Sequence, residues 1–248
     1  MADKGARPAI IAGYVKPLAR NLWQFVRRPT PSAFRLTLGR DFVNVFALLL
    51  TVQFVLALGS LGLLLGLVAA GVPLPEPAED EMSFSQLFIL AVIIAPVWEE
   101  CAFRGWLSGE LRSVAFAALG LALLGWLIVS SYGPGADPSG ESGLEALRFV
   151  LVLTLGGAVI WWFAPEPWRQ VPDWFANNFA AAVWLSSIAF GLMHILDFKG
   201  VTNIAHAIVV LPQTLGGLVL AYTRTRLGLR AAIAQHAAYN ALVIALFG

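Results

Sequence analysis

The chain has 248 residues, of which 58% are hydrophobic and only 12% are charged, and its formal net charge is +1. A soluble domain carries roughly 25% charged residues, so this composition excludes an ordinary water-soluble globular protein. The single cysteine, Cys101, excludes an intrachain disulfide and any metal site built only from cysteines. We expect membrane lipid around this protein and no nucleic-acid partner.

The N-terminal segment is basic. Residues 1–40 hold eight of the sixteen basic residues and only one acidic residue, Asp3. The positive-inside rule therefore predicts that this segment lies in the cytoplasm. Aromatic residues interleave with the charges (Tyr14, Trp23 and Phe25), which favours an interfacial segment on anionic lipid, and a solvated tail fits the pattern equally well. We divide the chain into this segment, residues 1–41, and a transmembrane domain, residues 42–248.

Long charge-free runs follow the basic segment. A helix that crosses the ~30 Å hydrocarbon core needs about 17–25 apolar residues. Helices are favoured over strands because each helix satisfies its own backbone hydrogen bonds, and the alternation of a transmembrane barrel is absent. The sequence predicts an all-α, polytopic membrane bundle of about seven helices, or eight if part of 9–40 inserts. The predicted spans are 45–70, 84–106, 114–132, 147–164, 178–197, 203–223 and 229–247.

The charges between the runs predict an orientation. The connections 71–83 and 133–146 contain acidic residues and no Lys or Arg, so both should lie outside the cytoplasm. Most arginines between the other spans fall on the cytoplasmic side, whereas Arg148 and Lys199 do not. We therefore expect a multi-pass protein, of a bacterial inner membrane, with a cytoplasmic N-terminus.

Two adjacent carboxylates, Glu99 and Glu100, end the second apolar run. On a helix, Glu100 and Arg104 are spaced i and i+4 and can pair, whereas Glu99 points about 100° away. One carboxylate can thus be held by arginine while the other faces a cavity. A carboxylate in an apolar site suits a general base. The alternative is a charged helix end at the membrane interface.

Histidines inside the later runs are the other polar candidates, because ionisable groups within spans are costly and often functional. His194 ends the fifth run, where a packing role is the alternative. His236 and Asn240 share one helix face at i, i+4 spacing, which also suits an interhelical clasp. His206, one turn after Asn203, belongs to no spacing that indicates chemistry.

Taken together, the motifs resemble a known family. Glu-Glu-x-x-x-Arg, Phe-x-x-x-His and His-x-x-x-Asn occur in this order at 99–104, 190–194 and 236–240. This order is similar to the CAAX prenyl protease and bacteriocin-processing family of intramembrane endopeptidases, and the resemblance covers roughly 84–248. It implies a protease core in that region and hydrolysis of a peptide bond within the membrane.

The resemblance also implies roles for the motif residues. Glu99 would be the base with His194 as its partner, and His236 and Asn240 would stabilise the oxyanion. Glu100 and Arg104 would order the site around them. The cofactor is either absent or zinc. A metal-dependent enzyme would use Glu99, His194 and His236 as ligands, whereas a glutamate-type enzyme would need no metal.

The substrate class and the competing functions stay open. The substrate would be a membrane-embedded or membrane-associated peptide or protein, with or without a prenyl group. A non-catalytic membrane scaffold or bacteriocin-immunity-type protein is the alternative, because family resemblance does not guarantee turnover. A transporter would show paired broken helices or an inverted repeat, and the sequence shows neither.

One difficulty concerns depth in the membrane. If its span begins at 178, His194 lies 16 residues along the helix, which is ~24 Å at the rise of an α-helix. His236 lies only about seven residues, or ~10 Å, into the last span. The two histidines should be neighbours, so the predicted span limits and this expectation conflict.

Overall fold

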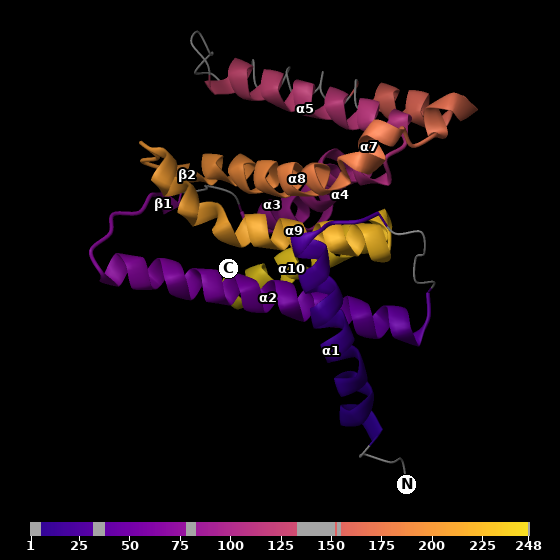
Figure 1. The fold of residues 1–248 in the computed structure, drawn as a ribbon. Helices are drawn as coiled ribbons and strands as arrows, with labels where there is room; N and C mark the ends of the chain where they lie inside the picture. The colour runs from indigo at the N-terminus through magenta and orange to yellow at the C-terminus, as the bar shows by residue number, and fades with distance from the viewer. Residues whose placement is uncertain (1–5, 32–37, 78–82, 133–151, 153–154, 248) are drawn as a thin grey trace. The chain divides into compact units, whose positions relative to one another are not determined.

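The computed structural model describes residues 6–31, 38–77, 83–132, 152 and 155–247 (Figure 1). It is mostly α-helical, as predicted. The chain divides into two compact units, one formed by Met1–Arg104 with Asn178–Gly248 and the other by Gly105–Asn177. All of the candidate site residues lie in the first unit.

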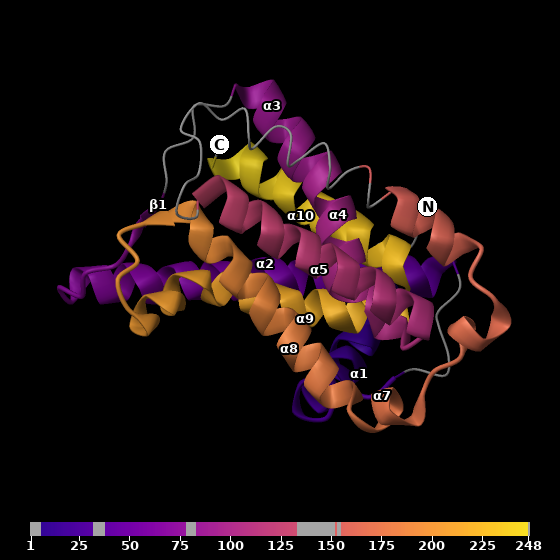
Figure 2. The ribbon, with the colours of Figure 1, turned by 90° about the horizontal axis from the view of Figure 1, so that it is seen from above.

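The first unit is a group of long helices. Its N-terminal part holds α1 (Ala6–Arg27), α2 (Arg40–Ala69), and one helical path made of α3 (Phe84–Phe88), the π-helix η1 (Ile89–Ile94) and α4 (Ala95–Arg104). Its C-terminal part holds α8 (Phe179–Met193), the 3₁₀ helices η4 (His194–Asp197) and η5 (Ile204–Val210), α9 (Leu211–Arg226) and α10 (Leu229–Phe247). In Figure 2, α4 lies beside α10 and α8 crosses α9, and both pairs are in contact.

The second unit holds the 3₁₀ helix η2 (Gly105–Ser108), α5 (Leu111–Tyr132), a helical stretch at 155–162, η3 (Glu166–Arg169) and α7 (Asp173–Asn177). Trp161 donates from Nε1 to Ser113 Oγ at 3.0 Å, which ties the stretch 155–162 to α5. The predicted span 114–132 lies within α5. The predicted connection 133–146, and most of the first half of the predicted span 147–164, lie outside the described residues.

Four helical segments of the described chain are long and apolar enough to cross a membrane: Arg40–Ala69, Phe84–Ser108, Phe179–Asp197 and Ile204–Arg226. They correspond to the predicted spans 45–70, 84–106, 178–197 and 203–223. The prediction of a polytopic membrane protein is confirmed, whereas a count of seven or eight spans stays a prediction. The last helix, α10, has 19 residues and carries polar side chains along its length, including Arg230, Gln235 and His236.

The expectation of an all-α fold missed a short antiparallel pair of strands, β1 (Glu76–Pro77) and β2 (Phe198–Lys199). Glu76 pairs with Lys199 and Pro77 with Phe198. Two-residue strands carry no sequence pattern of their own. The pairing places the connection after α2 and the connection after η4 at the same end of the helices, and the predicted topology also puts these two connections on one side.

The π-helix η1 has a local cause in Pro96. Proline has no N–H, and its ring collides with the carbonyl four residues earlier, so a regular α-helix cannot continue through it. The chain widens before it, and the N–H of Ala95 bonds to the carbonyl of Leu90, five residues back. The carbonyl of Ala91 consequently lacks the N–H of Ala95, and Pro96, five residues on, has no N–H to replace it.

Small residues let α8 and α9 approach closely. A Cβ added to Gly191 would lie 2.0 Å from Thr214 Oγ1, and one added to Gly217 would lie 3.3 Å from the Cα of Ser187. Small residues at helix contacts are the usual means of close packing in membrane bundles. This close packing brings the end of α8, with Phe190, against the face of α9 that borders the site.

Candidate active site

A buried ion pair lies within the first unit. Both Glu100 and Arg104, on α4, have side chains with 0% exposure, and Arg104 Nη1 donates to Glu100 Oε1 at 2.9 Å. The i, i+4 spacing predicted this contact. The guanidinium also lies over the ring of Phe190, with 3.9 Å from its central carbon to the ring centroid. A charge buried here without its partner would be strongly destabilising, so the pair is held as a unit.

His236, on α10, contacts both carboxylates of α4. Its Nδ1 lies 3.1 Å from Glu100 Oε1, and its Nε2 lies 3.7 Å from Glu99 Oε2. An ionised carboxylate only accepts hydrogen bonds, so the contact with Glu100 places a hydrogen on Nδ1 of His236. Glu100 therefore orients the imidazole, and Nε2 is the ring atom that faces Glu99.

His194 approaches the same cluster from the end of α8. Its Nδ1 lies 2.8 Å from the carbonyl oxygen of Phe190, an acceptor, which places the hydrogen on Nδ1 and leaves Nε2 for another partner. The ring of Phe190 contacts both histidines edge-on, at centroid distances of 4.8 Å to His194 and 5.7 Å to His236. The two histidines thus flank one ring, despite the different depths calculated from the sequence.

Asn240 lies one turn after His236 on α10 and faces the π-helix. Its Nδ2 donates to the carbonyl of Ala91 at 2.7 Å. This is the carbonyl that the π-helix and Pro96 leave without a main-chain donor. Asn240 thus satisfies a backbone group on the helix that carries Glu99 and Glu100, and the amide keeps one further hydrogen that this bond does not use.

Further polar contacts, which the sequence gave no reason to single out, hold the helices around the site. Arg224 donates from Nε to the carbonyl of Arg104 at 3.0 Å, at the end of α4. Gln235 donates to Gln53 Oε1 at 2.8 Å and lies 2.7 Å from Thr223 Oγ1, which joins α2, α9 and α10. The sequence did contain a signal for these contacts, because Gln53 and Gln235 are polar residues within two otherwise apolar runs.

Several buried polar atoms at the site have no hydrogen-bond partner among the described residues: Glu99 Oε2, Glu100 Oε2, Arg104 Nε and Arg104 Nη2. Most buried polar atoms in proteins are hydrogen-bonded. A cluster of buried atoms without partners is therefore unusual and marks a candidate functional site. The cluster offers two carboxylate acceptors and two guanidinium donors. The cluster therefore has hydrogen-bonding capacity that the described residues do not use.

The metal hypothesis required Glu99, His194 and His236 to gather as ligands. Within the described part of the chain, no three His, Cys, Asp or Glu side chains lie close enough together to hold a metal ion. Glu99 and His236 are neighbours, but His194 does not complete a ligand set with them. The residues as arranged here do not fit zinc.

His206 lies away from these residues, at the β1–β2 end. Its Nδ1 accepts from the N–H of Thr202 at 3.2 Å, and its Nε2 lies 3.3 Å from Asn203 Nδ2. Asn203 in turn caps η5 by accepting from the N–H of Ala205. The histidine thus belongs to the turn that begins η5.

Comparison with known proteins identifies a family. A model of the Rce1-like type II CAAX prenyl endopeptidases matches residues 82–242, which is more than half of the chain and includes all six candidate site residues. No curated protein and no solved structure matches the chain. The protein therefore belongs to the Rce1-like family of type II CAAX prenyl endopeptidases.

Proposed function

We propose that this protein is an intramembrane endopeptidase that hydrolyses a peptide bond of a lipidated or membrane-associated substrate, with Glu99 as its general base. The observation that carries this proposal is the placement of His236 against both Glu99 and Glu100, with Glu100 held by Arg104. Family membership suggests a protease of the CAAX type. The roles of the individual residues are our inference from the geometry.

In the proposed reaction, Glu99 takes a proton from a water molecule while the water oxygen attacks the scissile carbonyl carbon. A C–O bond forms and the carbonyl oxygen becomes an oxyanion. The C–N bond then breaks, and the proton held by Glu99 passes to the leaving nitrogen. The products are a carboxyl group and an amine, and the proton taken from water ends on the amine.

The other motif residues orient these partners and stabilise charge. Arg104 holds Glu100, and Glu100 orients His236 through Nδ1, so that Nε2 faces the reacting groups. We assign His194 to hold the attacking water through Nε2, because its Nδ1 is bonded to the carbonyl of Phe190. Asn240 has one amide hydrogen beyond the bond to Ala91. It is our choice to stabilise the oxyanion together with His236, which can donate from Nε2 only when that nitrogen also carries a hydrogen.

The substrate class follows from the family and from the apolar surroundings. Membership of the type II CAAX endopeptidase family suggests a peptide or a prenylated protein as the substrate. Around the carboxylates, the helical path from Phe84 exposes large apolar side chains such as Ile93, Ile94 and Val97, which suits contact with lipid or a lipid-modified chain. A non-catalytic scaffold is less well supported, because a scaffold has no need of a buried ion pair with unpartnered atoms and a second buried carboxylate, Glu99, next to it.

The purified protein, reconstituted in lipid, tests this proposal. It should cleave a peptide whose C-terminal cysteine is prenylated, and it should cleave the same peptide without the prenyl group more slowly. A chelator should leave the rate unchanged if the reaction needs no metal, and zinc-dependent recovery after chelation would show that a metal takes part. Absence of cleavage with both prenylated and transmembrane peptides would favour the scaffold function.

A further inference from the structure

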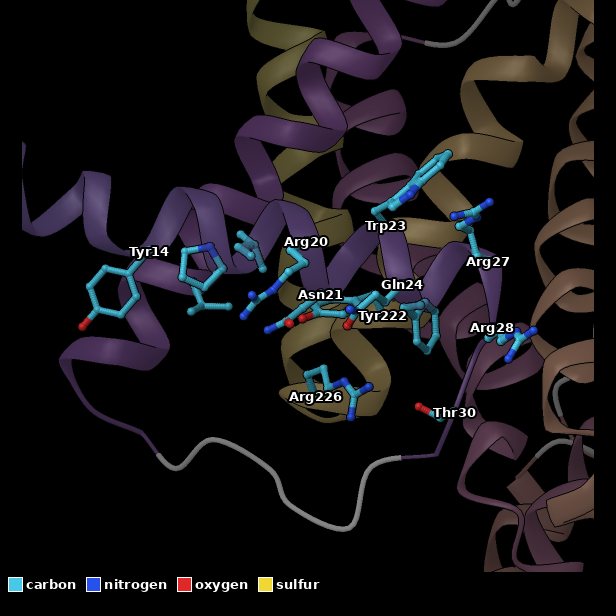
Figure 3. Close-up of a pocket in the computed structure, with 14 residues that line it drawn as sticks. Tyr14, Arg20, Asn21, Trp23, Gln24, Arg27, Arg28, Thr30, Tyr222 and Arg226 are labelled. Atoms are coloured by element: carbon cyan, nitrogen blue, oxygen red, sulfur yellow. The ribbon is translucent and has the colours of Figure 1, made fainter.

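A groove lies between α1 and the neighbouring ends of α2 and α9, away from the candidate active site. Its volume is about 1190 Å³, and it is lined by 14 residues, mainly from α1 and joined by Val45, Tyr222 and Arg226. Figure 3 shows Asn21, Gln24 and Tyr222 close together, with Arg20 and Arg226 beside them. All of α1 lies outside the region that matches the family.

The lining of this groove is strongly basic. It contains four arginines, and none of its residues carries a carboxylate: the arginines are Arg20, Arg27, Arg28 and Arg226. Within the described part of the chain, none of the four forms an ion pair. At one end, Tyr14 donates to Asp41, and Arg226 lies over the rings of Phe25 and Tyr222. Arginine presents a planar fork of donors that matches the oxygens of a phosphate.

Apolar side chains lie among these arginines. Leu18 and Phe25 are buried in the same lining, and Phe25 packs edge-on against Tyr222 at a centroid distance of 5.3 Å. A site for free inorganic phosphate would need no such surfaces. A ligand with an anionic head and an apolar body would use both parts of the lining.

The groove also lies where a membrane surface is expected. Val45 is close to the start of α2 and Arg226 is the last residue of α9, and both helices are candidate spans. Basic residues at the end of a span attract the headgroups of anionic lipids. We propose that this groove binds the phosphate headgroup of an anionic phospholipid, with Arg20, Arg28 and Arg226 as its donors.

Lipid retention in neutral detergent tests the proposal, because detergent removes the charged membrane surface and leaves only headgroups that the protein holds. The full-length protein is purified with added phosphatidylglycerol or phosphatidylcholine, and bound lipid is counted by native mass spectrometry. The wild type should retain phosphatidylglycerol in preference to phosphatidylcholine. The double variant Arg20→Gln/Arg28→Gln should retain roughly tenfold less phosphatidylglycerol.

The control removes the same charge elsewhere. Lys16 and Arg230 are exposed and do not line the groove, so Lys16→Gln/Arg230→Gln should retain phosphatidylglycerol within about twofold of the wild type. Arg226→Lys keeps the charge but loses the fork, and it should weaken retention by an intermediate amount. Equal losses in both double variants would overturn the proposal in favour of diffuse attraction. Displacement of the lipid by inorganic phosphate at equal concentration would overturn the choice of a lipid ligand.

Discussion

At the scale of single residues, the Glu100–Arg104 charge pair is shielded from water and holds the site together. Glu100 and Arg104 have 0% exposed side chains, so water does not screen their interaction. Breaking such a pair leaves one charge buried and uncompensated, which costs roughly 3–5 kcal/mol. His236 depends on the same carboxylate for its orientation. Loss of the pair should therefore affect both the stability of the protein and the geometry of the site.

The first prediction compares two arginines. Arg104→Ala should lower the free energy of unfolding by roughly 3–5 kcal/mol and abolish cleavage. Arg112→Ala removes a partly buried arginine that pairs with Glu110 and lies over the ring of Trp161. It should cost about 1–2 kcal/mol, because Glu110, with 29% of its side chain exposed, stays solvated. Unfolding in detergent and peptide cleavage measure both effects. Similar, mild effects of the two substitutions would contradict a structural role for the buried pair.

The sequence predicted the contact between Glu100 and Arg104 because i, i+4 spacing fixes it within one helix. It did not predict that His236 would contact both carboxylates, because that contact depends on the rotation of α10 about its axis. It included Phe190 only as the first residue of the Phe-x-x-x-His motif, and it did not predict that this ring lies against both histidines, since that contact also depends on how the helices pack. Contacts within one helix follow from spacing, whereas contacts between helices require packing.

At the scale of the elements, the π-helix couples α10 to the helix that carries the carboxylates. The carbonyl of Ala91 accepts from Asn240 because neither Ala95 nor Pro96 provides a main-chain donor. π-helical turns inside α-helices occur frequently at functional sites. The sequence contained the cause, Pro96, but not the result, because a proline can equally kink a helix or end it.

A second prediction follows from this contact. Asn240→Asp keeps the side-chain size but replaces the donor by an acceptor that faces a carbonyl. We expect a loss of about 1–3 kcal/mol in the free energy of unfolding, since the carbonyl of Ala91 then lacks its hydrogen bond. If Asn240 also stabilises the oxyanion, kcat falls further than the loss of stability explains, at unchanged KM. Unaltered stability would show that this hydrogen bond does not hold the π-helix.

The third prediction uses two adjacent glycines of α9. A Cβ on Gly217 would lie 2.9 Å from Arg104 Nη2, whereas a Cβ on Gly216 would lie no closer than 3.4 Å to Gln53. Gly217→Ala should displace the guanidinium, cost roughly 1–3 kcal/mol and reduce cleavage, because the site has no spare room. Gly216→Ala is the matched control and should retain both stability and activity. Equal behaviour of the two variants in unfolding and cleavage assays would argue against close packing around Arg104.

At the scale of the whole molecule, the sequence identified the class of protein better than its exact layout. Four predicted spans correspond to candidate membrane helices, because long charge-free runs are a strong signal. The division of the chain at Arg104 and Asn178 had no counterpart in the sequence. The β1–β2 pair was likewise missed, because two-residue strands form only when distant segments meet.

The fourth prediction concerns topology. The pairing of β1 with β2 places residues near Glu76 and Gly200 on the same side of the membrane, and α9 places Arg230 on the other side. Cysteines introduced at these three positions, in a Cys101→Ser background, should show this pattern with a membrane-impermeant thiol reagent. Labelling of positions 76 and 200 from opposite sides would contradict the arrangement of the first unit.

The central claim is that Glu99 is the general base of peptide hydrolysis, and cleavage of a prenylated peptide by reconstituted Glu99→Gln tests it most directly. The glutamine keeps the shape of the side chain but cannot take the proton, so the variant should fold like the wild type and lose about 10²–10⁴-fold in kcat. Glu110→Gln, outside the site, is the control and should cleave normally. Full activity of Glu99→Gln would contradict the role of Glu99, and full activity of Glu99→Gln/Glu100→Gln would contradict the proposed mechanism as a whole.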